Sequence, residues 1–361
     1  MLKKRIQLLS RLPLYRAFYT FARGRAPLPV NFTLSLLYSC NSRCATCNVY
    51  LKKVDNLTPD EYDRIFATVG QAPFWFTLSG GEPFLRKDIV DIARVIYQRS
   101  RPAIINIPTN GSLYRIIPER VEEILRACPE SDVIINLSLD EVGEKHDEIR
   151  GYPGNWERAI KTYQELQKLK RYPNLTLGIH TVISVFNVRR FPEIYKELIA
   201  LQPDSYITEI AEERVELETM GLDITPDADE YTAAIDFLIG EMKNSRLKGL
   251  ARVARSFRIE YYQLVKQFLQ THQQVIPCYA GVASCQISPD GEVWPCCIRA
   301  DSMGNLREHD YNFPKIWNGE AANRIRRSIK NRECACPLAN ASYTNLLLHG
   351  RSLTKIALRL V

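Results

Sequence analysis

The sequence lacks any run of 18 apolar residues, which excludes a helix that spans a membrane. It also lacks low-complexity segments, and its hydrophobic content of 45% and charged content of 25% are those of a folded globular protein. The opening "MLKKR" imitates a secretory signal, but Arg11 and Arg16 interrupt the apolar stretch too early. With no such signal, the ten cysteines indicate a reducing cytoplasm, where thiols serve as ligands or reagents.

Acidic side chains are missing from both ends of the chain. Residues 1–25 carry seven basic side chains and residues 341–361 carry three, so the net charge of +7 leaves −3 for residues 26–340. At both ends these cations alternate with large apolar residues. Such a pattern is typical of a peripheral anchor on the inner, anionic face of a membrane. The alternatives are packing against the rest of the protein or a surface for a partner. Because the middle of the chain has no basic stripe, we do not expect nucleic-acid binding.

Between the two ends, strand-like and helix-like segments alternate six times without a hairpin signal. The strand-like segments, such as "VNFTLSLLY" (30–38), are apolar nearly throughout, as in a parallel sheet covered by helices. The segment 58–69 predicts a helix with a capping box of Thr58 and Glu61. We therefore expect an α/β fold, a partial (β/α)6 TIM-like barrel with functional groups at the carboxyl ends of its strands.

Changes in composition and in the expected secondary structure divide the chain into five segments. The expected segments are a basic amphipathic arm at 1–27, the barrel at 28–220, a helical linker at 221–276, a small cysteine-rich domain at 277–340 and a basic amphipathic tail at 341–361.

Three cysteines, Cys40, Cys44 and Cys47, follow the first expected strand within eight residues. An odd number of thiols cannot pair completely, and a structural zinc site needs four ligands. Three soft thiolates suit an iron–sulfur cluster that keeps one position open. The alternative is a zinc site completed by a remote Cys or His.

Each later strand end carries polar or flexible residues that would meet these cysteines at one rim. They are Gly80, Gly81 and Glu82 after the second strand, Asn110 after the third, Ser138 and Asp140 after the fourth, and His180 to Ser184 at the fifth. Adjacent glycines permit a close approach to the backbone.

The spacing CxxxCxxC, followed after 32 residues by "GGEP" (80–83), resembles the radical S-adenosylmethionine (SAM) superfamily. The resemblance implies that Cys40, Cys44 and Cys47 hold three irons of a 4Fe–4S cluster and that SAM chelates the fourth. It also implies contacts with the SAM amino group from Gly80, Gly81 and Glu82, and with the ribose and adenine from Asn110, Ser138 and Asp140. The stretch "LSLDEVGEKHDEIRG" (137–151) is similar to one in peptide-modifying and cofactor-making members, or else is a capped helix start with solvated charges.

The region after Pro277 holds six of the ten cysteines. Its "SPDGEVWP" (288–295) predicts a tight turn between two short strands. The region resembles the SPASM or twitch extension of radical SAM enzymes, which implies one auxiliary 4Fe–4S cluster. The expected ligands are Cys278, Cys296, Cys334 and Cys336, with Cys285 and Cys297 as substitutes; a structural zinc is the alternative. Cys128 lies in a helical pattern and is expected to be a buried thiol.

The resemblance implies an enzyme that reductively cleaves SAM to a 5′-deoxyadenosyl radical, which abstracts hydrogen from a substrate. The electron donor would be a small protein such as flavodoxin or ferredoxin. The substrate would be a peptide, or a lipid or glycan carrier held at the membrane. A non-catalytic iron–sulfur or zinc protein is the alternative of another class. The acidic segment "TEIAEERVELE" (208–218) would either recognise a cationic or hydroxyl-rich substrate or form a solvated turn.

Overall fold

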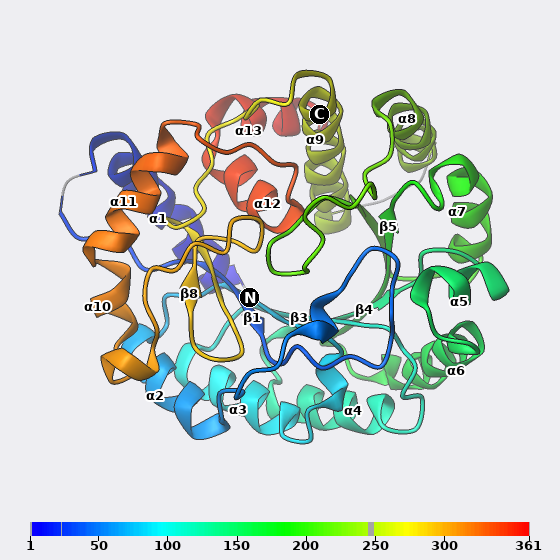
Figure 1. The fold of residues 1–361 in the computed structure, drawn as a ribbon, viewed down its shortest axis with the longest axis horizontal. Helices are drawn as coiled ribbons and strands as arrows, with labels where there is room; N and C mark the ends of the chain where they lie inside the picture. The colour runs from blue at the N-terminus through cyan, green and yellow to red at the C-terminus, as the bar shows by residue number, and fades with distance from the viewer. Residues whose placement is uncertain (1, 23, 245–248, 361) are drawn as a thin grey trace.

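The structure, a computed structural model that describes residues 2–22, 24–244 and 249–360, is built on one eight-stranded sheet (Figure 1). Its order is β6-β5-β4-β3-β2-β1-β7-β8; all neighbouring pairs from β6 to β7 are parallel, and β8 runs antiparallel to β7. The strands are β1 (Asn31–Ser35), β2 (Trp75–Ser79), β3 (Ile104–Thr109), β4 (Asp132–Ser138), β5 (Leu175–Ile183), β6 (Ser205–Ile210), β7 (Ser284–Ile287) and β8 (Val293–Trp294).

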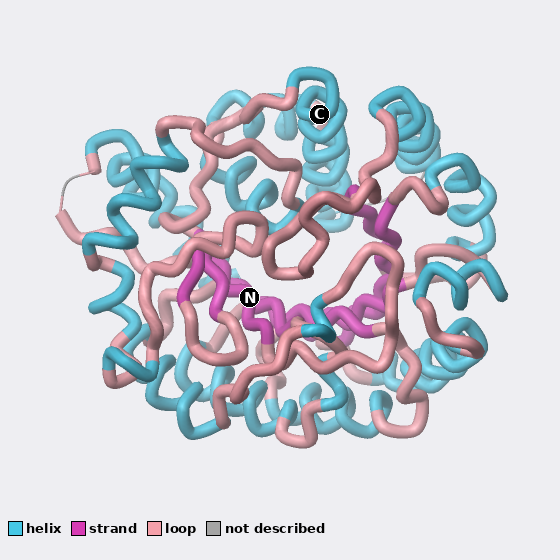
Figure 2. Tube along the Cα trace, in the orientation of Figure 1, coloured by secondary structure: helices cyan, strands magenta, loops and turns pink. Residues whose placement is uncertain are grey.

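Helices lie outside this sheet and across its open side (Figure 2). They are α1 (Leu2–Phe21), α2 (Pro59–Val69), α3 (Ile89–Ser100), α4 (Ile117–Ala127), α5 (Glu144–Arg150), α6 (Asn155–Gln167), α7 (Phe191–Ile199), α8 (Ala228–Asn244), α9 (Gly249–Thr271), α10 (Phe313–Trp317), α11 (Glu320–Lys330), α12 (Ala339–Leu348) and α13 (Gly350–Leu358).

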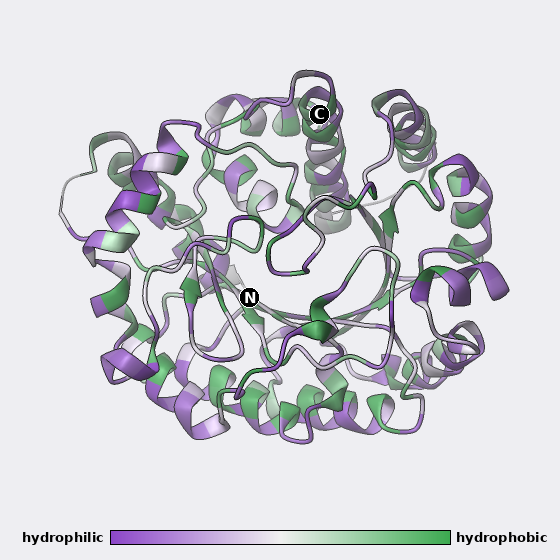
Figure 3. Cartoon of the chain, in the orientation of Figure 1, coloured by the Kyte–Doolittle hydropathy of each residue, from purple (hydrophilic) through white to green (hydrophobic). Residues whose placement is uncertain are grey.

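The six expected strand–helix units are confirmed, and together they form a partial TIM-like barrel. The capping box of α2 is also confirmed, because Glu61 N donates to Thr58 Oγ1 at 3.2 Å and Thr58 N donates to a Glu61 carboxylate oxygen at 2.8 Å. The buried stripe of α2 consists of the four expected residues, Tyr62, Ile65, Phe66 and Val69. In Figure 3 the covering helices turn hydrophobic faces inward and hydrophilic faces outward, which is the amphipathic pattern of a covered sheet.

Alternate residues of the strands face either the helices or the inside of the barrel. In β2, Phe76 and Leu78 are fully buried, whereas Trp75, Thr77 and Ser79 between them are partly exposed. The strands β3 and β6 alternate in the same way. The inner face of the sheet is therefore partly accessible. Its outer face packs against the helices and contributes to the main hydrophobic core.

The strands form an open arc, and helices from the second half of the chain lie across the open side between the edge strands β6 and β8 (Figures 1 and 2). On one side, Tyr262 of α9 accepts a hydrogen bond from Thr208 N at 3.2 Å. On the other, the side chain of Asn31 donates to Thr344 Oγ1 of α12 at 3.1 Å. The expected linker and tail thus supply the remaining wall of the barrel.

The cysteine-rich region shares the barrel sheet. The strand β7 lies parallel to β1, with Asn31 opposite Ser284. The expected tight turn follows, and the short strand β8 returns antiparallel, with Ile287 opposite Val293. The first and last thirds of the chain therefore pair within one sheet, near its β8 edge.

Helix α1 packs against the barrel with one side only. Leu12, Tyr15 and Phe18 are buried, whereas Ile6 is 59% and Phe21 is 68% exposed. Within the described residues, no helix is both long enough and apolar enough to cross a membrane.

Candidate functional site

The loop that carries the first three cysteines packs directly on the glycine pair. Gly81 N donates to Leu37 O at 2.8 Å, and Glu82 N donates to Ser39 O at 3.1 Å. A Cβ atom at Gly80 would lie 2.2 Å from Leu37 O, so any other residue would collide with the cysteine loop. The backbone of the cysteine loop is thus the group that approaches these two glycines closely.

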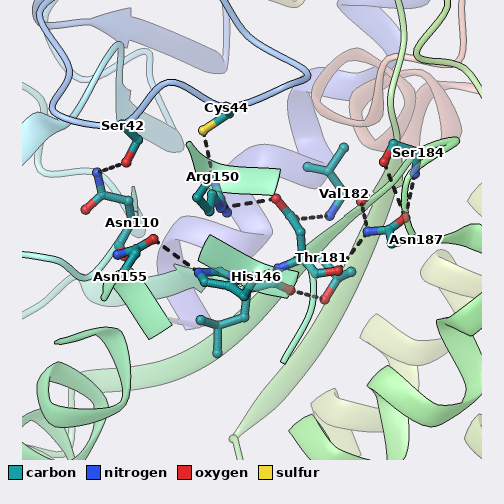
Figure 4. A network of polar contacts seen from close by, with 12 residues as sticks. Ser42, Cys44, Asn110, His146, Arg150, Asn155, Thr181, Val182, Ser184 and Asn187 are labelled. Carbon is teal, nitrogen blue, oxygen red and sulfur yellow. Dashed lines mark hydrogen bonds and ion pairs between the residues drawn. The ribbon is translucent and has the colours of Figure 1, made fainter. Parts of the chain in front are cut away.

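The three thiols lie in the loop after the carboxyl end of β1, and two of them are strongly desolvated. Burial raises the pKa of Cys40 to about 11 and that of Cys47 to about 12, so neither ionises at neutral pH without a cation. Two donors point at the sulfur atoms. Ser42 N lies 3.4 Å from Cys40 Sγ. Arg150 Nη1 lies 3.6 Å from Cys44 Sγ, as Figure 4 shows.

Among the described residues, no three Cys, His, Asp or Glu side chains converge on a point where a single metal ion would bind. In an iron–sulfur cluster each thiolate bonds a different iron, so the thiols surround the cluster rather than meet at one atom. Three soft thiols in one loop, with donors directed at two of the sulfurs, fit such a cluster.

The carboxylate of Glu82 is buried and connects two strand ends. It accepts hydrogen bonds from Phe84 N at 3.1 Å, from Thr109 Oγ1 at 2.8 Å and from Asn110 N at 2.8 Å. Burial outweighs these bonds and raises the pKa of Glu82 to about 7. Its carboxylate holds the ends of β2 and β3 together beside the glycine pair.

Asn110 ties the end of β3 to the cysteine loop. Its amide nitrogen donates to Asn41 Oδ1 at 2.8 Å and to Ser42 Oγ at 3.1 Å, as Figure 4 shows for Ser42. Its backbone carbonyl accepts from Asn155 Nδ2 at 3.1 Å. The structure therefore brings Asn110 to the cysteines, as the sequence predicted.

Ser138 and Asp140 lie at the end of β4, in two different environments. Ser138 is half-buried and faces the inside of the barrel, opposite His180 of β5. Asp140 is buried; one carboxylate oxygen accepts from Val182 N at 2.9 Å, and the other lies 3.1 Å from Arg150 Nε. The carboxylate of Asp140 is thus occupied by its own chain.

Arg150 is a site residue that the sequence analysis did not single out. It is buried and bridges Asp140 and Cys44 (Figure 4). Burial alone would lower its pKa, but the Asp140 carboxylate and the Cys44 thiolate outweigh burial and raise it. Its backbone carbonyl also accepts from Arg43 N at 2.9 Å. In the sequence, the stretch "HDEIRG" could have pointed to Arg150 as a site residue. The alternative interpretation of this stretch as solvated charges is wrong for Arg150, which is buried.

The cysteines of the C-terminal region divide into two groups. Cys278, Cys334 and Cys336 line one small cavity, together with Gln274, whose buried amide has no hydrogen-bond partner in the described structure. Cys296 packs in the apolar cluster beside Cys336. The four expected ligands are therefore brought together. Their burial raises the pKa of three of these thiols, Cys278, Cys296 and Cys336.

The other three cysteines have different surroundings. Cys297 packs in the same apolar cluster as Cys296 and Cys336, next to the cavity. Cys285 lies in β7 within the main core and does not line the cavity. Cys128 is fully buried, as expected, and its thiol donates to Ala93 O at 3.6 Å. Of the two substitutes named from the sequence, the structure brings only Cys297 to the other ligands.

The acidic segment after β6 lies between the two cysteine regions. Asn48 N, next to Cys47, donates to Leu217 O at 2.9 Å, and Glu216 N donates to Cys297 O at 3.2 Å. Glu212 and Glu216 are buried, so a solvated turn is the wrong description of these two residues.

The buried charges of this segment meet the inner face of the barrel. Arg214 Nη2 lies 3.2 Å from a carboxylate oxygen of Glu209 and 3.2 Å from one of Glu212. His180 Nε2 lies 3.4 Å from the other oxygen of Glu209. Burial raises the pKa of Glu212 to about 7, against the opposing effect of Arg214. A polar surface with acidic and basic side chains therefore lies at the barrel mouth, beside both groups of cysteines.

Comparison with known proteins agrees with this architecture. The family model described as the radical SAM superfamily matches residues 34–198, and the model described as the SPASM iron–sulfur cluster-binding domain matches residues 278–337.

Individual relatives span most of the chain. An AdoMet-dependent heme synthase of Methanosarcina barkeri is 28% identical over 81% of this chain and 83% of its own. The antilisterial bacteriocin subtilosin biosynthesis protein AlbA of Bacillus subtilis is 24% identical over 89% and 68%. The crystal structure of Streptococcus suis SuiB bound to S-adenosylmethionine superimposes with a TM-score of 0.61 and 14% identity, over 83% of this chain and 68% of that one, and shows a shared fold.

A partial barrel whose rim carries three thiols against a glycine pair, with a second cysteine group alongside, defines an iron–sulfur enzyme. The chain belongs to the radical SAM superfamily, and its C-terminal region is a SPASM domain. The cofactors of these domains are SAM with a 4Fe–4S cluster in the barrel, and auxiliary iron–sulfur in the SPASM domain.

Proposed function

We propose that this enzyme cleaves SAM reductively and abstracts hydrogen from a substrate held at the barrel mouth. The observation that carries the proposal is the packing of the three-cysteine loop on Gly80 and Gly81, at the carboxyl ends of the strands. Cys40, Cys44 and Cys47 would hold the 4Fe–4S cluster. When bound, the cluster and SAM supply a 5′-deoxyadenosyl radical.

The chain's own residues would then position SAM and the cluster. The backbone of the glycine pair, together with Asn110 and Ser138, would contact SAM. Asp140 would act through Arg150, because its carboxylate already accepts from Val182 N and pairs with that guanidinium. Arg150 donates to Cys44 Sγ and would keep a positive charge beside the thiolate.

The second cysteine group would hold one auxiliary 4Fe–4S cluster. The cavity and apolar cluster described above gather Cys278, Cys296, Cys334 and Cys336, and Cys297 is the adjacent substitute. A small electron donor, flavodoxin or ferredoxin, would supply reducing equivalents.

The substrate would meet the polar surface formed by His180, Glu209 and Glu212. Carboxylates beside one arginine and one histidine suit a substrate with a cationic or hydroxyl group. We favour a peptide, because the relative AlbA, whose name places it in bacteriocin biosynthesis, matches 89% of this chain.

A lipid or glycan carrier is the second candidate. The observation in its favour is the exposed apolar side of α1, where Ile6 and Phe21 face away from the barrel. Co-sedimentation of the full-length enzyme with anionic vesicles would favour this candidate over a peptide.

The test is SAM cleavage by protein reconstituted with iron and sulfide under anaerobic conditions. Dithionite-reduced enzyme should release 5′-deoxyadenosine, measured by chromatography, and the combined alanine substitution of Cys40, Cys44 and Cys47 should abolish release. Cys128→Ala is the matched control, because Cys128 is fully buried in the main core, and it should retain activity. A wild-type protein that binds iron but never cleaves SAM would contradict the proposal and favour the non-catalytic alternative.

A further inference from the structure

A cleft of about 340 Å³ lies between α1 and the amino-terminal end of the barrel. It is lined by residues of α1, by the segment that precedes β2, and by Ser100 and Arg101 at the end of α3. Cys40, Cys44 and Cys47 follow the opposite, carboxyl end of β1. The cleft is therefore separate from the site described above.

Three cations from two parts of the chain meet in this cleft. Lys4 Nζ donates to Pro102 O and Arg11 Nη1 donates to Ala72 O, both at 3.0 Å. These bonds fix α1 to the barrel and use one donor of each side chain, so further donors remain for a ligand. Arg101 is the third cation.

A single carboxylate, that of Glu130, lines the cleft with these cations, so the lining carries a net charge of +2. The pKa of Lys4 is lowered by its burial, and the neighbouring Arg101 adds to this effect while Glu130 opposes it. Glu130 therefore offsets part of the positive charge, and the three cations of the lining outnumber this one carboxylate. Such an arrangement stabilises a bound anion.

Ser100 supplies an uncharged donor at the same place. Its side chain is almost completely buried, and its hydroxyl has no hydrogen-bond partner in the described part of the chain. A buried hydroxyl without a partner is costly. A ligand oxygen in the cleft would satisfy it.

We propose that this cleft binds a phosphate group, held by Lys4, Arg11, Arg101 and the hydroxyl of Ser100. Guanidinium groups match phosphate oxygens through paired donors, and a phosphate monoester carries a charge close to −2, which the lining neutralises. The phosphate belongs either to a soluble ester or to a lipid headgroup. The exposed apolar residues of α1, such as Ile6 and Leu9, would lie beside the headgroup in the second case.

The first experiment measures binding of inorganic phosphate to the full-length reconstituted protein by equilibrium dialysis in a phosphate-free buffer. We expect saturable binding that Arg101→Gln and Ser100→Ala each weaken at least tenfold. Ser100→Ala should not lower the melting temperature of the phosphate-free protein, because the hydroxyl makes no bond within the described structure and its burial is costly. Arg25→Gln is the matched control, since Arg25 is an exposed cation that does not line the cleft, and it should bind like the wild type.

The second experiment distinguishes the two sources of phosphate. Co-sedimentation with vesicles that contain phosphatidic acid, lost in Arg101→Gln and Ser100→Ala, identifies a lipid headgroup. Phosphate binding without co-sedimentation identifies a soluble ester. The proposal is overturned if the wild type binds neither phosphate nor vesicles, or if Arg25→Gln weakens binding as much as Arg101→Gln does.

Discussion

His146 shows how one buried side chain fixes the strand end beside the cysteines. Its Nδ1 accepts from Asp140 N at 3.3 Å, so its Nε2 carries the proton and donates to Asn155 Oδ1 at 3.1 Å. Figure 4 shows this ring between its neighbours. The imidazole connects the end of β4 to the start of α6, and it does so in the neutral form.

This histidine should make stability depend on pH. Burial lowers the pKa of His146 from 6.5 to about 4. Below pH 6.5 the unfolded chain takes up a proton that the folded chain refuses until about pH 4, so stability falls as the pH falls through this window. The full effect is about 3 kcal/mol.

The measurement is urea unfolding between pH 7 and 5, for the wild type and for His146→Gln. The variant lacks the titrating group, so its free energy of unfolding should fall less over this range. Identical slopes for the two proteins would contradict the prediction.

The auxiliary ligands give a second prediction at the scale of single residues. Reconstituted wild-type protein should hold about eight irons, and Cys278→Ala should hold about four, because a four-iron cluster loses a ligand. Cys285→Ala should retain about eight, since Cys285 does not line the cavity. Iron analysis checks this, and equal loss in the two variants would show that the ligand assignment is wrong.

At the scale of elements, the cysteine loop and the glycine turn form one unit. A Cβ atom at Gly81 would lie 2.1 Å from Ser39 O, which is a backbone atom that cannot move without displacing the loop. We expect Gly81→Ala to destabilise the protein by about 2–3 kcal/mol and to impair assembly of the barrel cluster.

Gly240→Ala is the matched control for this glycine substitution. Gly240 lies inside α8 with open space around it, so alanine should stabilise the helix by about 0.5–1 kcal/mol. Thermal unfolding and the absorbance of the reconstituted cluster measure both variants. A Gly81→Ala protein with wild-type stability and iron content would refute the role of this contact.

Local elements were predictable from the sequence because their causes are local. The capping box of Thr58 and Glu61, the six parallel strands and the position of the cysteines after β1 all follow from short patterns. The bridge from Arg150 to Cys44 joins residues 106 positions apart, and its charges were open to an interpretation as a solvated loop. The burial of Glu212 likewise depends on chain segments that no local pattern identifies.

At the scale of the whole molecule, α1 belongs to the barrel. Tyr15 is buried, and its hydroxyl donates to Leu28 O at 2.5 Å. Arg16 Nε donates to Leu348 O at 2.8 Å and so joins α1 to α12. Of the three alternatives for the basic ends, packing against the rest of the protein therefore describes the inner side of α1.

Tyr15→Ala should destabilise the protein by about 3–4 kcal/mol, because it removes a buried ring and its hydrogen bond. Leu9→Ala, on the exposed side of the same helix, should change stability by no more than about 0.5 kcal/mol. Chemical denaturation of the two variants measures the difference. Equal effects would mean that α1 does not pack as the structure shows.

The pairing of β1 with β7 has a consequence for synthesis of the chain. Asn31 leaves the ribosome 253 residues before its partner Ser284. At ordinary elongation rates this interval lasts roughly 10 to 50 s. Throughout it, one edge of β1 offers unpaired N–H and C=O groups, which are a template for association with other chains. A nascent chain of this enzyme should therefore need protection by a chaperone until its final third emerges.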